Sequence, residues 1–421
     1  STETKFKPTT SATRGRHYIG RLMNPRTVLR RVWNQSAKVV FTLGAVALLA
    51  ACQSTSSTSA RPVGECVPVS LAFAGPLTGS PSANGIPPHD GAQLAVNQYN
   101  ESHADCPIEL VAFDTQGDKL IAASVAKKIV DDPRIVGVVG PVLSSETEVM
   151  MPVFDAGGLP MVSGSATNPG LADHGWRTFH RVIGNDAAQG PAAAAYIDER
   201  MGAKRVAVVD DGELYGKTLA DITAQNLADR GVTVALRTTI DPDAPTNDVA
   251  VAAAKAAGVD TVYFGGLGAS GGRLLKQLRE AKIDAAFVGG DGLYSADFVD
   301  IAGADTTNAI VTCPCVNSSR PGDDAQTAFF NAFQAAYGLA PSFYSAEYSD
   351  AASLLIDAVA SGRTTRDGVE DWLTSADVAG LTKQIGFDDR GEVKSSTIFV
   401  FKVDSAGAFN QVAVYRDNSL E

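Results

Sequence analysis

Short apolar runs alternate with helical patterns along most of this chain, and no other feature constrains its fold as strongly. In a first series, strands are expected at 67–74, 108–113, 135–139 and 160–163, with helices at 91–99, 121–130 and 146–154. In a second series, strands are expected at 206–209, 232–236, 262–265 and 286–289, with helices at 219–230, 249–257 and 272–281. Strands separated by helices of about ten residues form βαβ units and a parallel sheet. Two such series predict an α/β protein with two doubly wound, parallel-sheet lobes.

The final third of the chain adds too few elements for a third domain. A strand at 310–312, helices at 325–337 and 348–359, and a hairpin at 397–403 and 411–415 are expected there. We expect these pieces to complete lobe 1 (64–183 plus 316–382) and lobe 2 (184–315 plus 383–421). A chain that crosses between lobes more than once forms a hinge, and the cleft between the lobes is the natural ligand site.

The first 51 residues have the pattern of an export signal. They hold nine basic side chains and one acid, and their apolar run of twelve residues at 39–50 is too short to span a membrane. The run ends in Leu49-Ala-Ala-Cys52, which is similar to the lipobox of bacterial lipoproteins. The mature protein is therefore expected to begin at a lipid-bearing Cys52, with Met23 as an alternative start and a weak hint of twin-arginine export.

A polar segment follows the proposed lipid site. Residues 52–63 have too little apolar surface to fold and are expected to be a flexible tether. The working domain would then lie outside the cytoplasm, anchored by lipid to a bacterial membrane.

Net charge also limits the partners of the mature protein. The whole chain carries −12 and the first 51 residues carry +8, which leaves −20 on the mature protein. Such acidity argues against nucleic acid and against lying on anionic lipid, because both are polyanions.

Four cysteines follow Cys52. Cys66 and Cys106 each precede an expected strand, and a disulfide between them is possible if those strands are neighbours in a parallel sheet. Cys313 and Cys315, at i and i+2 in a strand, would lie awkwardly far apart for an unstrained bond. A metal site would need further ligands, and no histidine follows position 180. We interpret this second pair as structural and expect no metal.

One glycine-rich loop matches two catalytic motifs. The segment 268–272 (GASGG) fits a nucleophile elbow, but all five histidines precede Ser270, whereas that fold places its histidine after the serine. The segment 266–271 (GLGASG) fits a dinucleotide fingerprint, with Asp291 twenty residues beyond it. An exported protein does not normally meet a nicotinamide cofactor. We therefore expect neither an enzyme nor a cofactor, and interpret the loop as a tight turn of small residues.

Polar residues follow several strands at their carboxyl ends, which is the edge where open α/β sheets bind ligands. Ser144 follows the third strand, and Ser145 with Glu148 has capping-box spacing, which predicts a helix N-terminus suited to a ligand carboxylate. The segment 164–169, rich in hydroxyl side chains, follows the fourth strand, and Asp291 ends a strand of the other lobe. Taken alone, each of these is more often an ordinary cap or turn residue.

Eight short stretches give these positions a common context. They are 73–79 (FAGPLTG), 90–96 (DGAQLAV), 136–145 (VGVVGPVLSS), 158–169 (GLPMVSGSATNP), 181–190 (RVIGNDAAQG), 215–216 (YG), 263–266 (YFGG) and 289–292 (GGDG). In their order and spacing, the chain from Val67 to Tyr415 resembles the type 1 periplasmic binding proteins of the branched-chain amino acid and amide transport family. The resemblance implies two doubly wound lobes joined by a multi-crossover hinge.

The resemblance also implies a role for each matching residue. Ser144 and the backbone N–H of Thr167 would hold the carboxylate of an amino acid ligand. The carbonyl of Ser165 and the hydroxyl of Thr167 would meet its ammonium group, with which Asp291 would pair. Tyr215 would line the hinge side of the site.

The chain departs from the family pattern in two parts of the site. Around the ligand side chain, Asn84 and Leu267 stand where leucine-type binders commonly have tyrosines. At the ammonium group, Asp291 is one methylene shorter than the usual glutamate. The head group of the ligand is therefore better supported than its side chain. An amide or a small carboxylate remains an alternative ligand.

These inferences predict a lipid-anchored solute-binding protein of an ABC importer, a monomer that passes its ligand to a membrane permease. A rival from another class is a regulatory lipoprotein of the same fold that contacts a wall-synthesis enzyme or a sensor. A cleft filled by bulky side chains would favour that rival. A hydrolase dependent on Ser270 ranks third.

Overall fold

The computed structural model describes residues 66–421. The predicted export signal, the proposed lipid site at Cys52 and the predicted tether lie outside the described residues. Within the described part, no helix combines the length and the apolar character needed to cross a membrane.

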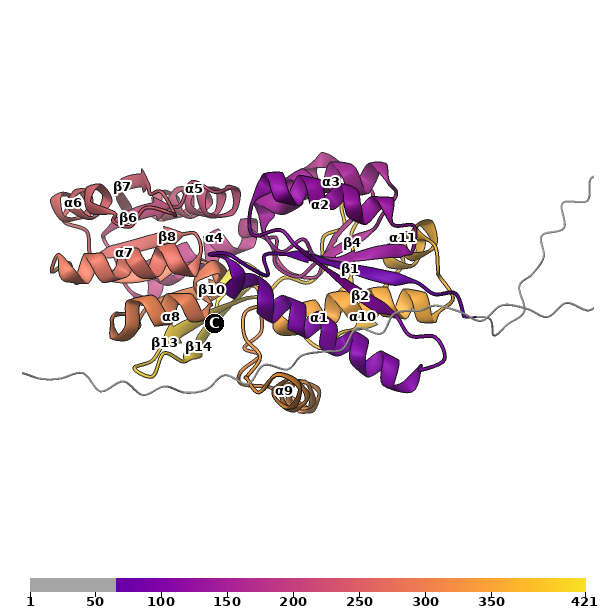
Figure 1. Ribbon diagram of the computed structural model, residues 1–421. Helices are drawn as coiled ribbons and strands as arrows, with labels where there is room; N and C mark the ends of the chain where they lie inside the picture. The colour runs from indigo at the N-terminus through magenta and orange to yellow at the C-terminus, as the bar shows by residue number, and fades with distance from the viewer. Residues whose placement is uncertain (1–65) are drawn as a thin grey trace, which may run out of the picture. The chain divides into compact units, whose positions relative to one another are not determined.

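Five parallel strands form the first sheet, in the order β2-β1-β3-β4-β5 (Figure 1). They are β1 (Ser70–Gly75), β2 (Glu109–Asp114), β3 (Ile135–Val139), β4 (Met161–Ser163) and β5 (Phe179–Arg181). The helices packed around this sheet are α1 (Ser82–Ser102), α2 (Lys119–Asp131), α3 (Ser144–Ala156), α9 (Asp324–Tyr337), α10 (Ser345–Ala360) and α11 (Arg366–Thr374). A small two-stranded sheet, β11 (Asp377–Ala379) with β12 (Gln384–Gly386), follows them.

Both faces of the first sheet are covered, and β1 illustrates how. Leu71 and Phe73 join the core that contains residues of α1 and α10, whereas Ala72 and Ala74 join the core under α2 and α3. Successive side chains of a strand point to opposite faces. Because both faces are buried, β3 is apolar throughout and β1 is apolar after Ser70, instead of alternating with polar residues.

The second sheet has eight strands in the order β15-β14-β13-β10-β9-β8-β6-β7. Its parallel strands are β6 (Arg205–Asp210), β7 (Thr233–Thr239), β8 (Thr261–Gly265), β9 (Ala286–Gly289) and β10 (Ile310–Cys313). Three antiparallel strands extend it, namely β13 (Ile398–Val403), β14 (Phe409–Arg416) and β15 (Ser419–Leu420). Its helices are α4 (Asp186–Ala195), α5 (Leu214–Asp229), α6 (Asp248–Ala257), α7 (Gly268–Glu280) and α8 (Ala296–Ala302). The predicted α/β class with doubly wound parallel sheets is confirmed.

The first helix is longer than its sequence pattern indicated. The sequence pattern predicts a helix from Gly91, and Pro87 and Pro88, which lack the N–H that a helix interior uses, precede that residue. In the structure α1 begins nine residues earlier, at Ser82, and runs through both prolines. This extension places Asn84 in the first turn of the helix.

The chain passes between the two sheets after β5, after β10 and before β13. The chain at Gly391, shortly before the last passage, still lies beside the first sheet. The N–H of Arg181, the last residue of β5, donates to the carbonyl of Gly391 at 3.0 Å. We therefore propose that the last crossing lies between Glu392 and Ile398, later than the limit at 383 expected from the sequence.

Two disulfides are present in the described chain. Cys66 and Cys106, which precede the neighbouring strands β1 and β2, are joined with a Cα–Cα distance of 5.3 Å. Cys313 and Cys315 are also joined, with their Cα atoms 5.1 Å apart. The expectation that the second pair lies too far apart was wrong because it placed both residues in one strand. β10 ends at Cys313, and the chain turns at Pro314, which brings the two sulfurs within bonding distance.

Candidate functional site

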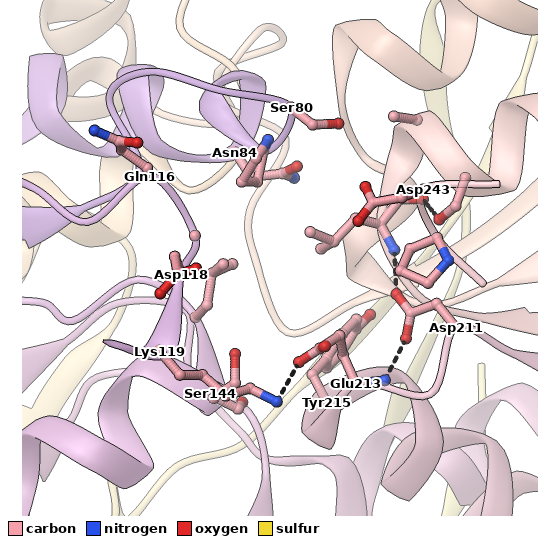
Figure 2. Close-up of a pocket in the computed structure, with 18 of the residues that line it drawn as sticks. Ser80, Asn84, Gln116, Asp118, Lys119, Ser144, Asp211, Glu213, Tyr215 and Asp243 are labelled. Carbon is pink, nitrogen blue, oxygen red and sulfur yellow. Dashed lines mark hydrogen bonds and ion pairs between the residues drawn. The ribbon is translucent and has the colours of Figure 1, made fainter. Parts of the chain in front are cut away.

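The carboxyl ends of both sheets border one cavity of about 550 Å³, a size typical of small-molecule sites (Figure 2). Loops after β1, β2 and β3 supply one wall, and loops after β6, β7 and β8 supply the other. Asn84, Ser144, Tyr215 and Leu267, four of the residues predicted from the sequence, line this cavity. The site therefore lies between the two sheets, at the edge where open α/β folds bind ligands.

Ser144 lies at the N-terminus of α3, as predicted, but the cap is built differently. The N-cap residue is Leu143, and its N–H donates to a carboxylate oxygen of Glu146 at 3.2 Å. The predicted capping pair of Ser145 and Glu148 was wrong, because the helix begins two residues earlier and Glu148 instead contacts His174. Ser144 lines the cavity, and its hydroxyl oxygen accepts the backbone N–H of Asn168, in the loop that follows β4, at 3.2 Å.

That loop carries Ser165 and Thr167, which are buried and do not line the cavity. The Ser165 hydroxyl donates to the carbonyl of Val142 at 2.7 Å and lies 2.9 Å from the hydroxyl of Tyr348, so it holds the loop in place. The Thr167 hydroxyl oxygen is fully enclosed and has no hydrogen-bond partner among the described residues. A buried polar atom without a partner indicates a place where a ligand or water bonds.

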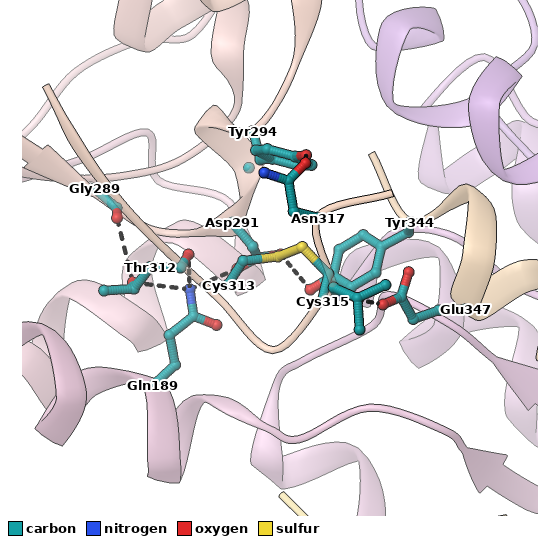
Figure 3. The surroundings of a disulfide bond; sticks show 12 residues. Gln189, Gly289, Asp291, Tyr294, Thr312, Cys313, Cys315, Asn317, Tyr344 and Glu347 are labelled. Atoms are coloured by element: carbon teal, nitrogen blue, oxygen red, sulfur yellow. Dashed lines mark hydrogen bonds between the residues drawn. A yellow bond between two sulfur atoms is a disulfide. The ribbon is translucent and has the colours of Figure 1, made fainter. Parts of the chain in front are cut away.

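Asp291 lies behind the cavity wall and is enclosed by hydrogen-bond donors (Figure 3). One carboxylate oxygen accepts from the amide of Gln189 and from the hydroxyl of Tyr215, both at 2.8 Å. The other accepts from the hydroxyl of Tyr344 at 3.0 Å. Burial raises the pKa of Asp291, although these three donors oppose the shift. Tyr215 thus connects the cavity to Asp291, because it lines the cavity and its hydroxyl donates to the Asp291 carboxylate.

A second buried acid was missed by sequence reasoning. Asp186 begins α4 after the N-cap Asn185, is fully buried, and has no hydrogen-bond partner for either carboxylate oxygen. Its backbone N–H donates to the carbonyl of Thr167 at 2.9 Å, and its carboxylate lies beside the Thr167 hydroxyl, which opposes the rise of its pKa. Burial, with the nearby charge of Asp291, raises its pKa well above the ordinary value. An acid after an asparagine cap resembles any helix start, so no sequence signal could have identified it.

Polar contacts join the two walls across the cavity. The Lys119 ammonium, at the start of α2, lies 2.9 Å from the carboxylate of Glu213, at the start of α5 (Figure 2). The amide of Asn168 donates to the carbonyl of Leu214 at 3.3 Å and to the hydroxyl of Thr218 at 2.9 Å. These contacts hold the two lobes close together around the space between them.

The glycine-rich loop after β8 is explained by packing. The Ser270 hydroxyl donates to the carbonyl of Leu267 at 3.0 Å and therefore caps the turn. A Cβ at Gly268 would lie 2.0 Å from the hydroxyl oxygen of Ser295, so a larger residue there would have to displace that side chain. In the described part of the chain, no three histidine, cysteine or acidic side chains are grouped to hold a metal ion.

Three buried acids make stability depend on pH. Burial raises the pKa of Glu146, Asp211 and Glu347 to about 7 each. Because these values exceed the ordinary ones, the folded state holds more protons than the unfolded state between about pH 4.5 and 7. The free energy of unfolding is therefore expected to fall as pH rises through this window, by at least about 1 kcal/mol. Denaturant unfolding at pH 5 and pH 8 measures it.

Glu146→Gln provides the control for this prediction. The amide can accept from the Leu143 N–H and donate to the Thr115 hydroxyl, which replaces both contacts of the protonated acid. The variant is expected to lose part of the pH dependence and to be more stable than the natural protein at pH 8. An unchanged pH dependence in the variant would contradict the assignment to Glu146.

Comparisons with known proteins agree with this geometry. The family model described as periplasmic binding protein matches residues 68–408. The leucine-, isoleucine-, valine-, threonine- and alanine-binding protein of Pseudomonas aeruginosa is 30% identical over 337 residues, which cover 79% of this chain and 89% of that protein. A substrate-binding protein of a branched-chain amino acid transporter from Streptococcus pneumoniae, solved in complex with isoleucine, is 26% identical with a TM-score of 0.74. That match covers 82% of this chain and 99% of the other.

Proposed function

The chain belongs to the periplasmic binding protein family, with the branched-chain amino acid-binding proteins as relatives, and we propose that it captures a small amino acid for an ABC importer. One observation carries the proposal. Ser144 at a helix N-terminus on one sheet edge and Tyr215 on the opposing edge line a cavity of about 550 Å³, and the Tyr215 hydroxyl bonds Asp291 behind its wall. An amino acid zwitterion could present its carboxylate to the helix N-terminus at Ser144 and its ammonium to the side that holds Tyr215 and Asp291.

The chemistry of the head group follows from these positions. The carboxylate of the ligand would meet the free N–H groups of α3 and the hydroxyl of Ser144, because a helix N-terminus favours negative charge. The ammonium would meet the unpartnered hydroxyl of Thr167, the carbonyl of Ser165 and the carboxylate of Asp291. A ligand that contacts both lobes stabilises the closed arrangement relative to an open one.

A regulatory role on the same fold is less well supported. That alternative would be favoured by a cleft filled with bulky side chains, whereas this cavity is open and holds one aromatic ring, Tyr215, among its lining residues. We therefore retain solute capture as the proposed function.

Lipid anchoring and delivery to a permease complete the proposal. A lipid on Cys52 and a tether over 52–63 would keep the protein near its permease and raise its effective concentration there. Metabolic labelling with a radioactive fatty acid tests the anchor. Label is expected on the natural protein and absent from Cys52→Ala, and equal labelling of both would contradict the assignment.

Isothermal titration calorimetry of the purified protein against the common amino acids and small amides tests the central claim. Micromolar or tighter binding of at least one amino acid is expected. The absence of any binder across that panel would refute the proposed function.

Ser144→Ala is expected to weaken binding of that amino acid by about 10-fold, because one hydrogen bond to a charged carboxylate is lost. The matched control is Ser270→Ala, which lines the same cavity but whose hydroxyl already bonds the carbonyl of Leu267. The control is expected to bind nearly as the natural protein does. Equal losses in both variants would contradict a specific role for Ser144.

A further inference from the structure

We propose that Asn84 makes the site select a ligand whose side chain forms hydrogen bonds, such as a hydroxyl or an amide, over an aliphatic ligand of the same shape. The inference rests on the proposed function and names the ligand class within it. It is carried by a buried amide that the described protein leaves unpaired.

Asn84 belongs to the cavity wall. It lies in the first turn of α1 and is only 2% exposed, and Figure 2 shows its side chain directed toward the space between the walls. Its amide nitrogen is enclosed and has no hydrogen-bond partner among the described residues. No hydrogen bond is formed by its amide oxygen within that part of the chain either. The backbone fixes its position, because its N–H donates to the carbonyl of Pro81 at 2.9 Å.

Three acidic side chains of the wall already have partners. Asp118 accepts the N–H groups of Leu120 and Ile121 as the cap of α2. Asp211 accepts the N–H groups of Glu213 and Leu267. The carboxylate of Glu213 in turn pairs with the Lys119 ammonium.

These contacts make a cationic ligand side chain a poor match. The buried acid of the wall, Asp211, is already bonded to two backbone N–H groups, whereas Asp118 is exposed and Glu213 half-exposed, so that solvent screens their charges. Asp243 also lines the cavity, but it is exposed and its charge is screened by solvent. Asn84 is therefore the buried group of the wall that most needs a partner.

The energetic consequence is a preference between isosteric ligands. An amide carries both a donor and an acceptor, so a hydroxyl or amide of the ligand can pair with whichever end faces it. An aliphatic side chain would seal the cavity and leave the Asn84 amide buried without a partner, which is costly. A site built to hydrogen-bond a group discriminates strongly against the analogue that lacks it.

The test uses two isosteric ligand pairs, threonine with valine and asparagine with leucine. Calorimetry on the purified protein is expected to show threonine and asparagine binding about 10-fold or more tightly than their aliphatic counterparts. Asn84→Leu is expected to bring both ratios close to one or invert them. Asn97→Leu, the same substitution on the exposed face of α1, is expected to leave both ratios unchanged.

Failure of this inference is distinguishable from failure of the proposed function. If valine and leucine bind as tightly as their polar counterparts, or if Asn84→Leu leaves the ratios unchanged, the selectivity is refuted and amino acid capture stands. A preference for lysine or arginine would also overturn it. If no amino acid binds the natural protein at all, the proposed function is refuted and the selectivity falls with it.

Discussion

Asp291→Ala is expected to weaken amino acid binding by about 100-fold or more, because it removes the buried negative charge that we propose pairs with the ligand ammonium. The loss is larger than that of a single hydrogen bond. The substitution also leaves the amide of Gln189 and the hydroxyls of Tyr215 and Tyr344 without their common acceptor. Unpaired buried donors add their own desolvation cost.

Asp291→Asn separates the two contributions. Asparagine retains an oxygen that can accept hydrogen bonds but carries no charge, so its affinity is expected to lie between those of the natural protein and the alanine variant. Calorimetry of all three with one ligand measures the series. Equal affinity of the natural protein and the asparagine variant would show that the charge of Asp291 does not contact the ammonium.

The raised pKa of Asp291 predicts a pH dependence of binding as well. Below that pKa the free protein holds a protonated carboxyl, which must release its proton to pair with an ammonium. The affinity is therefore expected to decrease as pH falls through the raised pKa and to be constant well above it. The asparagine variant should lack this dependence.

The sheets could be predicted because their central strands are buried on both faces. Such strands appear as continuous apolar runs between helices, which is a strong local signal. β5 (Phe179–Arg181) was missed, since three residues give no usable periodicity. The turn at Pro314 that brings Cys313 and Cys315 together was also missed, because the strand was extended past its end.

The site could be predicted only in part, for a related reason. Position relative to a strand end placed Ser144 on the cavity, because parallel strands align their carboxyl ends, whereas Tyr215 was assigned to the site only by the family resemblance. The partners of Asp291 come from α4, from α5 and from the segment before α10, and no local pattern links residues so far apart. The same applies to Asp186, whose burial depends on packing across the lobes.

Arg181 is the structural support of the loop that carries Thr167. Its guanidinium is fully buried, and it donates to the carbonyls of Ala166 at 2.7 Å and Asn168 at 2.9 Å, on either side of Thr167. It also forms a two-point pair with Glu392, in which its Nε lies 2.7 Å from one carboxylate oxygen. A planar fork that bonds two carbonyls and a carboxylate together fixes the loop in one conformation.

Glu392→Gln is therefore expected to lower the free energy of unfolding by about 3–5 kcal/mol, because it leaves the Arg181 charge buried without its counter-ion. Denaturant unfolding measures the loss. The control is the exposed ion pair of Arg390 with Asp173 at 2.7 Å, where Asp173→Asn is expected to cost less than about 1 kcal/mol. The double variant Arg181→Met with Glu392→Leu should be more stable than Glu392→Gln, since it removes both buried charges. If Glu392→Gln costs no more than Asp173→Asn, the buried pair is not what holds the loop. If the double variant is fully folded but binds the amino acid more weakly, the Arg181 guanidinium itself positions Thr167 for binding.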